Sequence, residues 1–263
     1  MIDIGVNLTS SKFHGDRSAV VERARKSGIE TFVITGTSLD ASRQALELAN
    51  EFDVFTTAGV HPHDAKDWHG ASSDALRDLA RTPRVVAIGE CGLDFDRNYS
   101  PPEAQLFAFR EQLEIARDTG LPLFLHERCA HEAMLEVLEP MRPALGAIVI
   151  HCFTGTHEEL LRYLALDLHI GITGWICDER RGTGLYELAA EIPADRLMVE
   201  TDAPWLLPRT LVTKPKDRRN EPAFLPEVVR VLAAARGEDA EVTARATTAT
   251  ARRFFRLDEQ PGA

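Results

Sequence analysis

Residues 121–153 read LPLFLHERCAHEAMLEVLEPMRPALGAIVIHCF and contain the pattern that decides the fold. A short apolar run, Leu123 to His126, is followed by an amphipathic stretch, Ala130 to Leu138, and then by a second apolar run, Ala147 to His151. The two runs have the length of strands, whereas the apolar spacing of the middle stretch is typical of a helix that buries one face. The stretch therefore predicts two strands joined by a helix, which is the repeating unit of a parallel sheet.

The same alternation extends over the whole chain. Eight strands are expected, at Ile2 to Asn7, Thr31 to Thr35, Phe55 to Gly59, Val85 to Gly89, Leu123 to His126, Ala147 to His151, His169 to Ile172 and Leu197 to Glu200. Further helices are expected at Asp16 to Ser27, Ala41 to Glu51, Pro102 to Thr119 and Glu158 to Leu164, with a closing helix after Glu221-Pro222. Eight such units close most economically into an α/β protein with the (β/α)8 TIM-barrel fold.

The length of the chain fits one domain of this kind. It has 263 residues, of which 44% are hydrophobic and 27% are charged, as in an ordinary globular protein. The segment Pro208 to Pro226 is rich in Pro, Lys and Arg, and we interpret it as a long loop, because only a single helical region follows it. We therefore predict one barrel domain over residues 1–263, with a frayed tail at Asp258 to Ala263.

Charge and cysteine content narrow the class of protein. With 30 Lys and Arg against 41 Asp and Glu, the net charge is −11, which excludes a generally basic nucleic-acid binder. The four cysteines contain no Cys-x-x-Cys pair and are interpreted as reduced thiols of a cytoplasmic protein. No signal peptide and no apolar run of about 18 residues is evident, so no membrane segment is expected. A monomer is the expected state, because no heptad or exposed apolar stripe is evident.

Acidic and imidazole side chains stand where the predicted strands end. They are His61 and His63 after the third strand, Glu90 after the fourth, His126 at the end of the fifth, His151 at the end of the sixth, and Glu200 and Asp202 after the eighth. The carboxyl ends of barrel strands carry the active site. A single histidine in such a place is more often a packing residue, but five strand ends together indicate a shared site, because unpaired groups are costly to bury. The thiols of Cys91 and Cys152 are expected to point to the opposite face, since side chains alternate along a strand.

This donor set points to a metal-dependent hydrolase. Two carboxylates and two imidazoles, from Glu90, Asp202, His126 and His151, suit Mg²⁺, Mn²⁺ or Zn²⁺. Such an ion lowers the pKa of water and polarises a phosphoryl or carbonyl oxygen, which favours hydrolysis. Pro62 places His61 and His63 in a turn, where they shape the loop or contact the substrate. The residues by themselves do not identify the substrate.

Several longer strings narrow the substrate class. They are DIGVNLTSSKF, AGVHPHDAKDW, VVAIGECGLDF, HCFTGT, GITGWICDERRG, ETDAPWLLPR and RRNEP. They resemble the TatD family of metal-dependent deoxyribonucleases, and they resemble the branch that gives this family its name more than its distant relatives. The strings are spread from residue 3 to residue 222, and the resemblance covers essentially the whole chain. The resemblance implies a magnesium-dependent TIM barrel that removes nucleotides from the 3′ end of DNA, prefers single strands and acts on some RNA. It is compatible with a role in DNA repair or in the DNA breakdown of dying cells.

The resemblance also implies roles for individual residues. By position, Glu90, His126 and His151 match the family's metal ligands, and Glu90 would bridge two ions if two are present. Asp202 matches the carboxylate that coordinates metal or accepts the proton of the attacking water. With Glu90, it is the expected catalytic residue.

The chain departs from the wider family at two places. The family opens with Asp-x-His-x-His, whereas this chain has Asp3-Ile4-Gly5-Val6-Asn7, so two imidazoles of a second metal position are absent. After the fifth strand the family has Arg-Asp-Ala, whereas this chain has Arg128-Cys129-Ala130. Cys129 does not replace a carboxylate, and Glu127 is the nearest residue that could.

An acidic chain that binds DNA needs a local basic surface. Arg180 and Arg181 follow the seventh strand, and Lys214, Lys216, Arg218 and Arg219 follow the eighth, on the same expected face of the barrel. We expect substrate contacts from His61, His63, Arg180, Arg181 and Arg219. Phe153, Trp175 and Trp205 lie near these loops and could stack on unpaired bases.

Two other functions stay open from the sequence. A metal-dependent amidohydrolase acting on a small cyclic amide or ester would share the barrel and the ligands, and its activity would not depend on the basic loops. A non-catalytic nucleic-acid-binding barrel would have lost turnover together with the histidines of the first strand.

Overall fold

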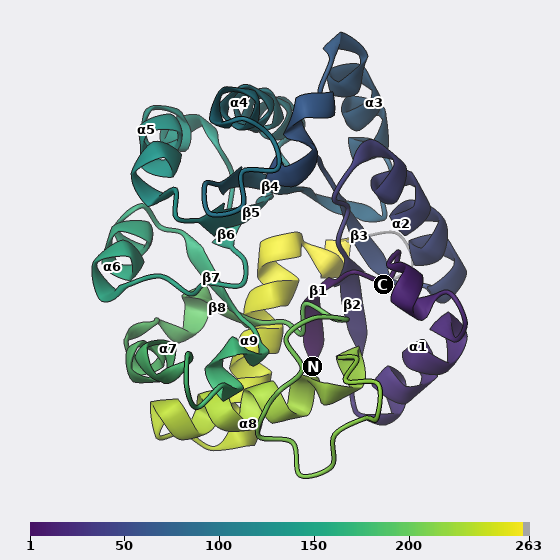
Figure 1. Cartoon of the computed structure of the whole chain (residues 1–263), viewed down its shortest axis with the longest axis vertical. Coiled ribbons are helices and arrows are strands. Elements are labelled where there is room, and N and C mark those ends of the chain that lie inside the picture. Colours follow the sequence, from purple (N-terminus) through teal and green to yellow (C-terminus); the bar gives the residue numbers. More distant parts are fainter. Residues whose placement is uncertain (260–263) are drawn as a thin grey trace.

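The computed structural model describes residues 1–259, which form a barrel of parallel strands inside a ring of helices (Figure 1). The eight strands are neighbours in chain order. They are β1 Ile2–Val6, β2 Thr31–Ile34, β3 Phe55–Ala58, β4 Val85–Asp94, β5 Leu123–Arg128, β6 Ile148–Ile150, β7 His169–Ile172 and β8 Leu197–Val199. Asn7 N–H donates to the Ala203 carbonyl at 2.8 Å and Asp202 N–H donates to the Gly5 carbonyl at 2.9 Å, so the chain after β8 is joined to β1. The expected TIM barrel is confirmed.

One helix follows each strand, and a second follows the last. They are α1 Arg17–Lys26, α2 Leu39–Phe52, α3 Gly70–Ala80, α4 Pro102–Thr119, α5 His131–Met141, α6 His157–Ala165, α7 Thr183–Leu188, α8 Leu225–Arg236 and α9 Ala240–Phe255. The prediction of a single closing helix is wrong, because Gly237, at φ +66°, ends α8 and separates it from α9. Within residues 1–259, no helix combines the length and the apolarity that a membrane span requires.

Strand β4 is longer than the sequence indicated. It continues past Gly89 to Asp94, and its register with β5 shifts so that Gly92 pairs with His126 and Asp94 with Arg128. Gly89 has φ +137°, and a Cβ there would meet the carbonyl oxygen of Phe124, so only glycine fits this close approach of β4 to β5. The extended pair β4–β5 carries Glu90 and Asp94 into the mouth of the barrel.

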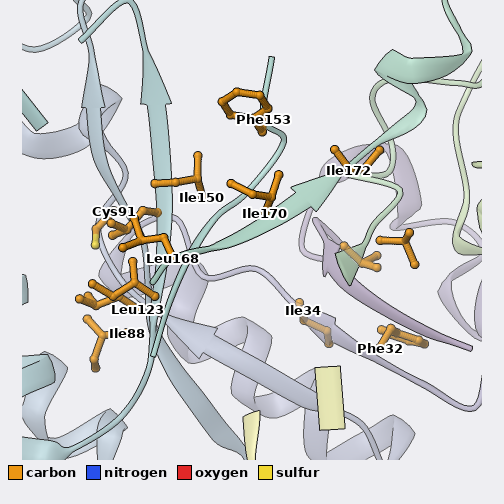
Figure 2. Packing of buried hydrophobic residues seen from close by; sticks show 14 of the residues in the cluster. Phe32, Ile34, Ile88, Cys91, Leu123, Ile150, Phe153, Leu168, Ile170 and Ile172 are labelled. Carbon is orange, nitrogen blue, oxygen red and sulfur yellow. The ribbon is translucent and has the colours of Figure 1, made fainter. Parts of the chain in front are cut away.

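Apolar side chains fill two spaces. Outside the sheet, residues such as Phe32, Ile34 and Ile170 pack in the larger cluster with the surrounding helices (Figure 2). Inside the barrel, a second cluster joins strand residues such as Phe124 to Phe254 of α9. Helix α9 lies at the centre of the ring in Figure 1 and packs against β1 and β8. Because Phe254 also contacts His169 at the start of β7, α9 closes the amino ends of the strands, and polar side chains are left to the carboxyl ends.

The expected frayed tail at Asp258 to Ala263 is wrong for its first two residues. Asp258 belongs to a short 3₁₀ helix, Leu257–Glu259. Residues 260–263 lie outside the described residues.

Asp3 is a buried carboxyl group in β1 whose protonation should affect stability. It accepts hydrogen bonds from Thr201 N at 2.9 Å and Thr201 Oγ1 at 2.6 Å, but burial outweighs them and raises its pKa to about 8 from 3.8. Between these two pH values the folded chain holds a proton that the unfolded chain has lost. This group's contribution to the free energy of unfolding should therefore fall as pH rises from about 4 to 8, by up to about 1.4 kcal/mol per pH unit.

Urea denaturation at pH 5, 7 and 9 checks this prediction. The wild-type chain should lose stability over this range more steeply than an Asp3→Asn variant, which has no proton to lose. Equal slopes for the two proteins would show that Asp3 does not titrate in this range.

Candidate functional site

Glu90 lies at the centre of a group of histidines at the carboxyl ends of the strands. Its Oε1 lies 3.2 Å from His61 Nε2, 3.0 Å from His126 Nδ1 and 2.8 Å from His151 Nε2. The four residues belong to β4 and β5 and to the segments that directly follow β3 and β6. Because parallel strands end at the same edge of a barrel, these four side chains lie close together although they are up to 90 positions apart in the sequence.

The charges in this group are coupled. Burial would raise the pKa of Glu90, but His151 and His61 together hold it well below its usual range. In turn, burial opposes a charge on His151, but Glu90 and Glu200 raise its pKa well above the usual range. Burial also opposes a charge on His126, but Asp94 and Glu90 raise its pKa. For His61 burial prevails and lowers the pKa to about 4, so this ring is neutral at pH 7.

The donor atoms fit a divalent cation. Within residues 1–259, one set of three candidate ligands has its donor atoms within 4.8 Å of one another, and it consists of His61, Glu90 and His126. Across the described residues 1–259, the buried Nε2 atoms of His126 and His151 make no hydrogen bond. Asp94 Oδ2 lies 3.5 Å from the first and Glu90 Oε1 lies 2.8 Å from the second, but the angles do not suit a hydrogen bond. A buried nitrogen without a partner is costly, and a cation would satisfy it. A carboxylate with imidazoles and without thiolate is a donor set for Mg²⁺, Mn²⁺ or Zn²⁺.

Two more buried carboxylates hold the histidine rings. Glu200 Oε2 lies 3.3 Å from His151 Nδ1. Asp94 Oδ2 lies 2.7 Å from His63 Nε2 and 3.5 Å from His126 Nε2. Carboxylates in such positions fix the orientation of ligand rings. The sequence pointed to Glu200 as a strand-end residue but missed Asp94, whose signal was a second acidic residue four positions after Glu90 in the string VVAIGECGLDF.

Asp202 faces this group from the end of β8. Asn7 Nδ2 donates to its Oδ1 at 2.9 Å, so Asn7, at the position where the wider family has a histidine, holds this carboxyl group. Burial raises the pKa of Asp202 to about 7, although His151 lowers it. Asp202 therefore exchanges its proton near neutral pH.

Apart from the fully buried Glu200, these residues line one pocket of about 770 Å³ at the mouth of the barrel. Three cations, Arg97, Arg128 and Arg181, line the same pocket. Arg181 also pairs with Asp178 at 2.9 Å, while Arg180 is exposed beside it, 3.6 Å from the same carboxylate. The sequence therefore located one basic wall of the pocket but missed the pair Arg97 and Arg128 on the β4–β5 side.

The structure places Arg219 elsewhere. Its Nη2 lies 2.7 Å from Asp16 Oδ2 and 2.7 Å from Glu221 Oε1, and its guanidinium lies 5.0 Å from the ring centre of Phe13. These contacts join the long loop after β8 to the start of α1. Arg219 thus supports the loop and is not available as a contact to a substrate.

An Arg219→Ala substitution should therefore lower stability without weakening nucleic-acid binding. We expect a loss of about 1–3 kcal/mol in the free energy of unfolding, because Asp16 and Glu221 each lose one of their two arginine partners and keep only Arg23. Chemical denaturation measures this loss, and Arg181→Ala is the matched control, expected to weaken oligonucleotide binding with little loss of stability. A weaker oligonucleotide affinity of the Arg219→Ala protein, at unchanged stability, would contradict the structural role.

Three expectations about single residues need correction or comment. Phe153 is 2% exposed within the larger apolar cluster, so it does not face a substrate. Cys152 lines the pocket, because the chain leaves β6 with φ +48° at this residue and side-chain alternation no longer applies. Burial raises the pKa of its thiol to about 12, so it stays protonated. Glu127 accepts hydrogen bonds from Ala130 N at 2.7 Å and from Tyr163 Oη at 3.3 Å, and it lines the pocket, so its replacement of the missing carboxylate at Cys129 stays a prediction.

Comparison with known proteins gives one consistent result. Residues 2–256 match the sequence family described as TatD related DNase. The 3′-5′ ssDNA/RNA exonuclease TatD of Erwinia tasmaniensis is 55% identical over 259 residues, which cover 98% of this chain and all of that protein. A solved TatD homologue from Escherichia coli K12 superposes with a TM-score of 0.88 at 28% identity, over 97% of this chain and 98% of that one. A TatD family hydrolase from Entamoeba histolytica superposes with a TM-score of 0.87 at 27% identity, over 97% of each chain.

Proposed function

The chain belongs to the TatD related DNase family, and on that premise we propose that it is a metal-dependent exonuclease that removes nucleotides from the 3′ end of single-stranded DNA and RNA. Mg²⁺ is the expected cofactor, with Mn²⁺ or Zn²⁺ as substitutes. We take the active form to be a monomer of one domain, which light scattering in solution would check.

The observation that carries this proposal is the convergence of three imidazoles on Glu90 Oε1, each within 3.2 Å. Glu90, His126 and His151 would hold the cation, with His61 beside them. When bound, the cation would stabilise the negative charge that builds up on the phosphate oxygens during hydrolysis.

Asp202 is suited to accept the proton of the attacking water. Its Oδ1 is held by Asn7, which leaves Oδ2 for the proton, and its pKa of about 7 matches a group that takes up and releases a proton near neutral pH. His63 and Arg181 line the same pocket and would contact the nucleotide.

Two observations favour this function over a small-molecule amidohydrolase or a non-catalytic barrel. Arginines on both sides of the pocket provide the positive charge that a phosphate backbone requires. The ligand set at Glu90 is intact, which a barrel without turnover would not need.

Degradation of a 5′-labelled single strand tests the proposal. Wild-type protein with Mg²⁺ should yield a ladder that shortens from the 3′ end, on deoxyribose and ribose oligonucleotides alike, and EDTA should stop it. Parallel reactions with Mn²⁺ and Zn²⁺ identify the effective ion. Intact oligonucleotides with every metal would contradict the proposal, and hydrolysis of a cyclic amide instead would favour the amidohydrolase.

Salt should weaken binding only moderately. If the pocket neutralises about three phosphates, through Arg97, Arg128 and Arg181, the logarithm of the binding constant should fall with the logarithm of salt concentration with a slope of about −2. Anisotropy titrations of a labelled oligonucleotide in EDTA measure this slope. A slope near zero would contradict the basic walls of the pocket.

A further inference from the structure

An exposed tryptophan stands at the rim of the pocket, three residues after Asp202. Trp205 lines the pocket and is 47% exposed. The backbone N–H of Trp205 donates to the Asp202 carbonyl at 3.0 Å. The carbonyl of the intervening Ala203 accepts a hydrogen bond from the backbone N–H of Asn7, which follows β1. The backbone therefore holds the indole at a fixed place beside the candidate catalytic carboxyl group.

Packing alone does not account for this exposure. Trp175, on the same rim, is half-buried, its Nε1 donates to the Arg181 carbonyl at 3.3 Å, and the Arg181 guanidinium lies 4.5 Å from its ring centre. The Trp175 side chain thus packs against Arg181 and stabilises the loop after β7. Trp205 instead leaves about half of a large apolar ring in water, and unlike the exposed Phe107 of α4 it does so at the rim of the pocket.

A cation accompanies the exposed ring. Lys12 belongs to the short 3₁₀ helix Ser11–Phe13 in the loop after β1, and its Nζ lies 4.8 Å from the Trp205 ring centre. Lys12 thus stands over one face of the ring, while about half of Trp205 stays exposed. The exposed part of an aromatic ring and a nearby ammonium group match the two parts of a nucleotide, which are a planar base and a phosphate.

We propose that Trp205 and Lys12 form a binding subsite for one unpaired nucleobase of the substrate and its adjacent phosphate. The subsite rests on the proposed function and adds to it a residue that determines specificity. Because a base inside a duplex is paired and stacked on its neighbours, only a free base can lie on Trp205. The subsite therefore favours single strands, and since every base has a π face, it accepts deoxyribose and ribose strands without strong sequence preference.

Oligonucleotides that lack a single base test the subsite. A tetrahydrofuran residue is placed at the first, second, third or fourth position from the 3′ end of a 5′-labelled strand, in deoxyribose and ribose series. With the wild-type protein, kcat/KM should fall about tenfold to a hundredfold at one of these positions. Trp205→Ala should cause the same loss on the intact strand and no further loss on that one abasic strand. Trp205→Phe should restore most of the activity.

A binding measurement without turnover separates this proposal from the proposed function. In EDTA, an intact single strand should quench the tryptophan fluorescence of the wild-type protein, and Trp205→Phe should lose most of the quenching. Phe107→Ala, which removes an aromatic side chain of 54% exposure from α4, is the matched control and should leave affinity and kcat/KM unchanged. Quenching in EDTA, combined with no turnover in parallel reactions with Mg²⁺, Mn²⁺ or Zn²⁺, would contradict the nuclease and leave the subsite supported.

Three results would overturn the subsite. The first is a wild-type protein indifferent to every abasic position. The second is a Trp205→Ala loss that is equal on intact and abasic strands, which would indicate a structural role. The third is unchanged quenching in Trp205→Phe.

Discussion

Glu90→Gln is expected to reduce kcat/KM on a single-stranded oligonucleotide by about a thousandfold or more and to weaken metal binding strongly. The side chain keeps its size, but the charge that faces His61, His126 and His151 is lost. A cation in the site would then keep the imidazoles and lose the carboxylate that they share. Losses of about this size follow when one preorganised charge is removed from an active site.

Two measurements check this expectation. Quenched-flow or gel assays give kcat/KM, and calorimetry with Mn²⁺ gives the metal affinity. Glu103→Gln, in the first turn of α4, removes the same charge from an exposed position and should leave both unchanged. If Glu90→Gln kept more than a tenth of the activity, Glu90 would not be the central ligand.

Gly171→Ala is expected to cost about tenfold to a hundredfold in metal affinity and in activity, although residue 171 contacts no substrate. A Cβ at this position would lie 2.6 Å from Glu200 Oε1 and 3.2 Å from the Cα of His151. Glu200 Oε1 accepts the hydrogen bond from Cys152 N at 2.6 Å, and Oε2 lies 3.3 Å from His151 Nδ1. The added methyl group therefore displaces the carboxylate that orients His151.

A double-mutant cycle isolates this effect. Gly171→Ala should be costly in the wild-type background and nearly neutral for metal affinity once Glu200→Ala has removed the carboxylate. Gly184→Ala, in α7, adds a methyl group in open space and serves as the control. An equal cost of Gly171→Ala with and without Glu200 would show that the methyl group acts on the barrel as a whole.

Much of the fold is determined by local sequence. The alternation of short apolar runs with helix-period stretches predicts eight strands, and Pro102–Thr119 begins at a proline and ends before Gly120, as expected. The long β4 was not predictable in this way, because it depends on pairing with β5 across a register shift at Gly89. The register of β4 is set by its partners in β5, which lie more than thirty positions away in the sequence. The hydrophobic pattern within β4 therefore does not predict where the strand ends.

The residues of the candidate site also fall into those that local sequence predicted and those that it missed. The strand ends identified Glu90, His126 and His151, because each polar side chain interrupts an apolar run. Asp94 was missed, and His61 was assigned to the substrate rather than to the ligand group, since their place depends on where the extended β4 and the turn after β3 meet.

By itself, then, the sequence determined the barrel, the edge at which the site lies and the carboxylate at its centre, because these follow from side-chain period and strand order. Only the tertiary structure decided which charged side chains are available there. Arg181 and Arg219 are both arginines of loops at this face, yet one lines the pocket and the other lies between Asp16 and Glu221. The orientation of a charged side chain depends on the oppositely charged group that it pairs with. In a barrel that group is usually distant in sequence, as Asp16 is from Arg219.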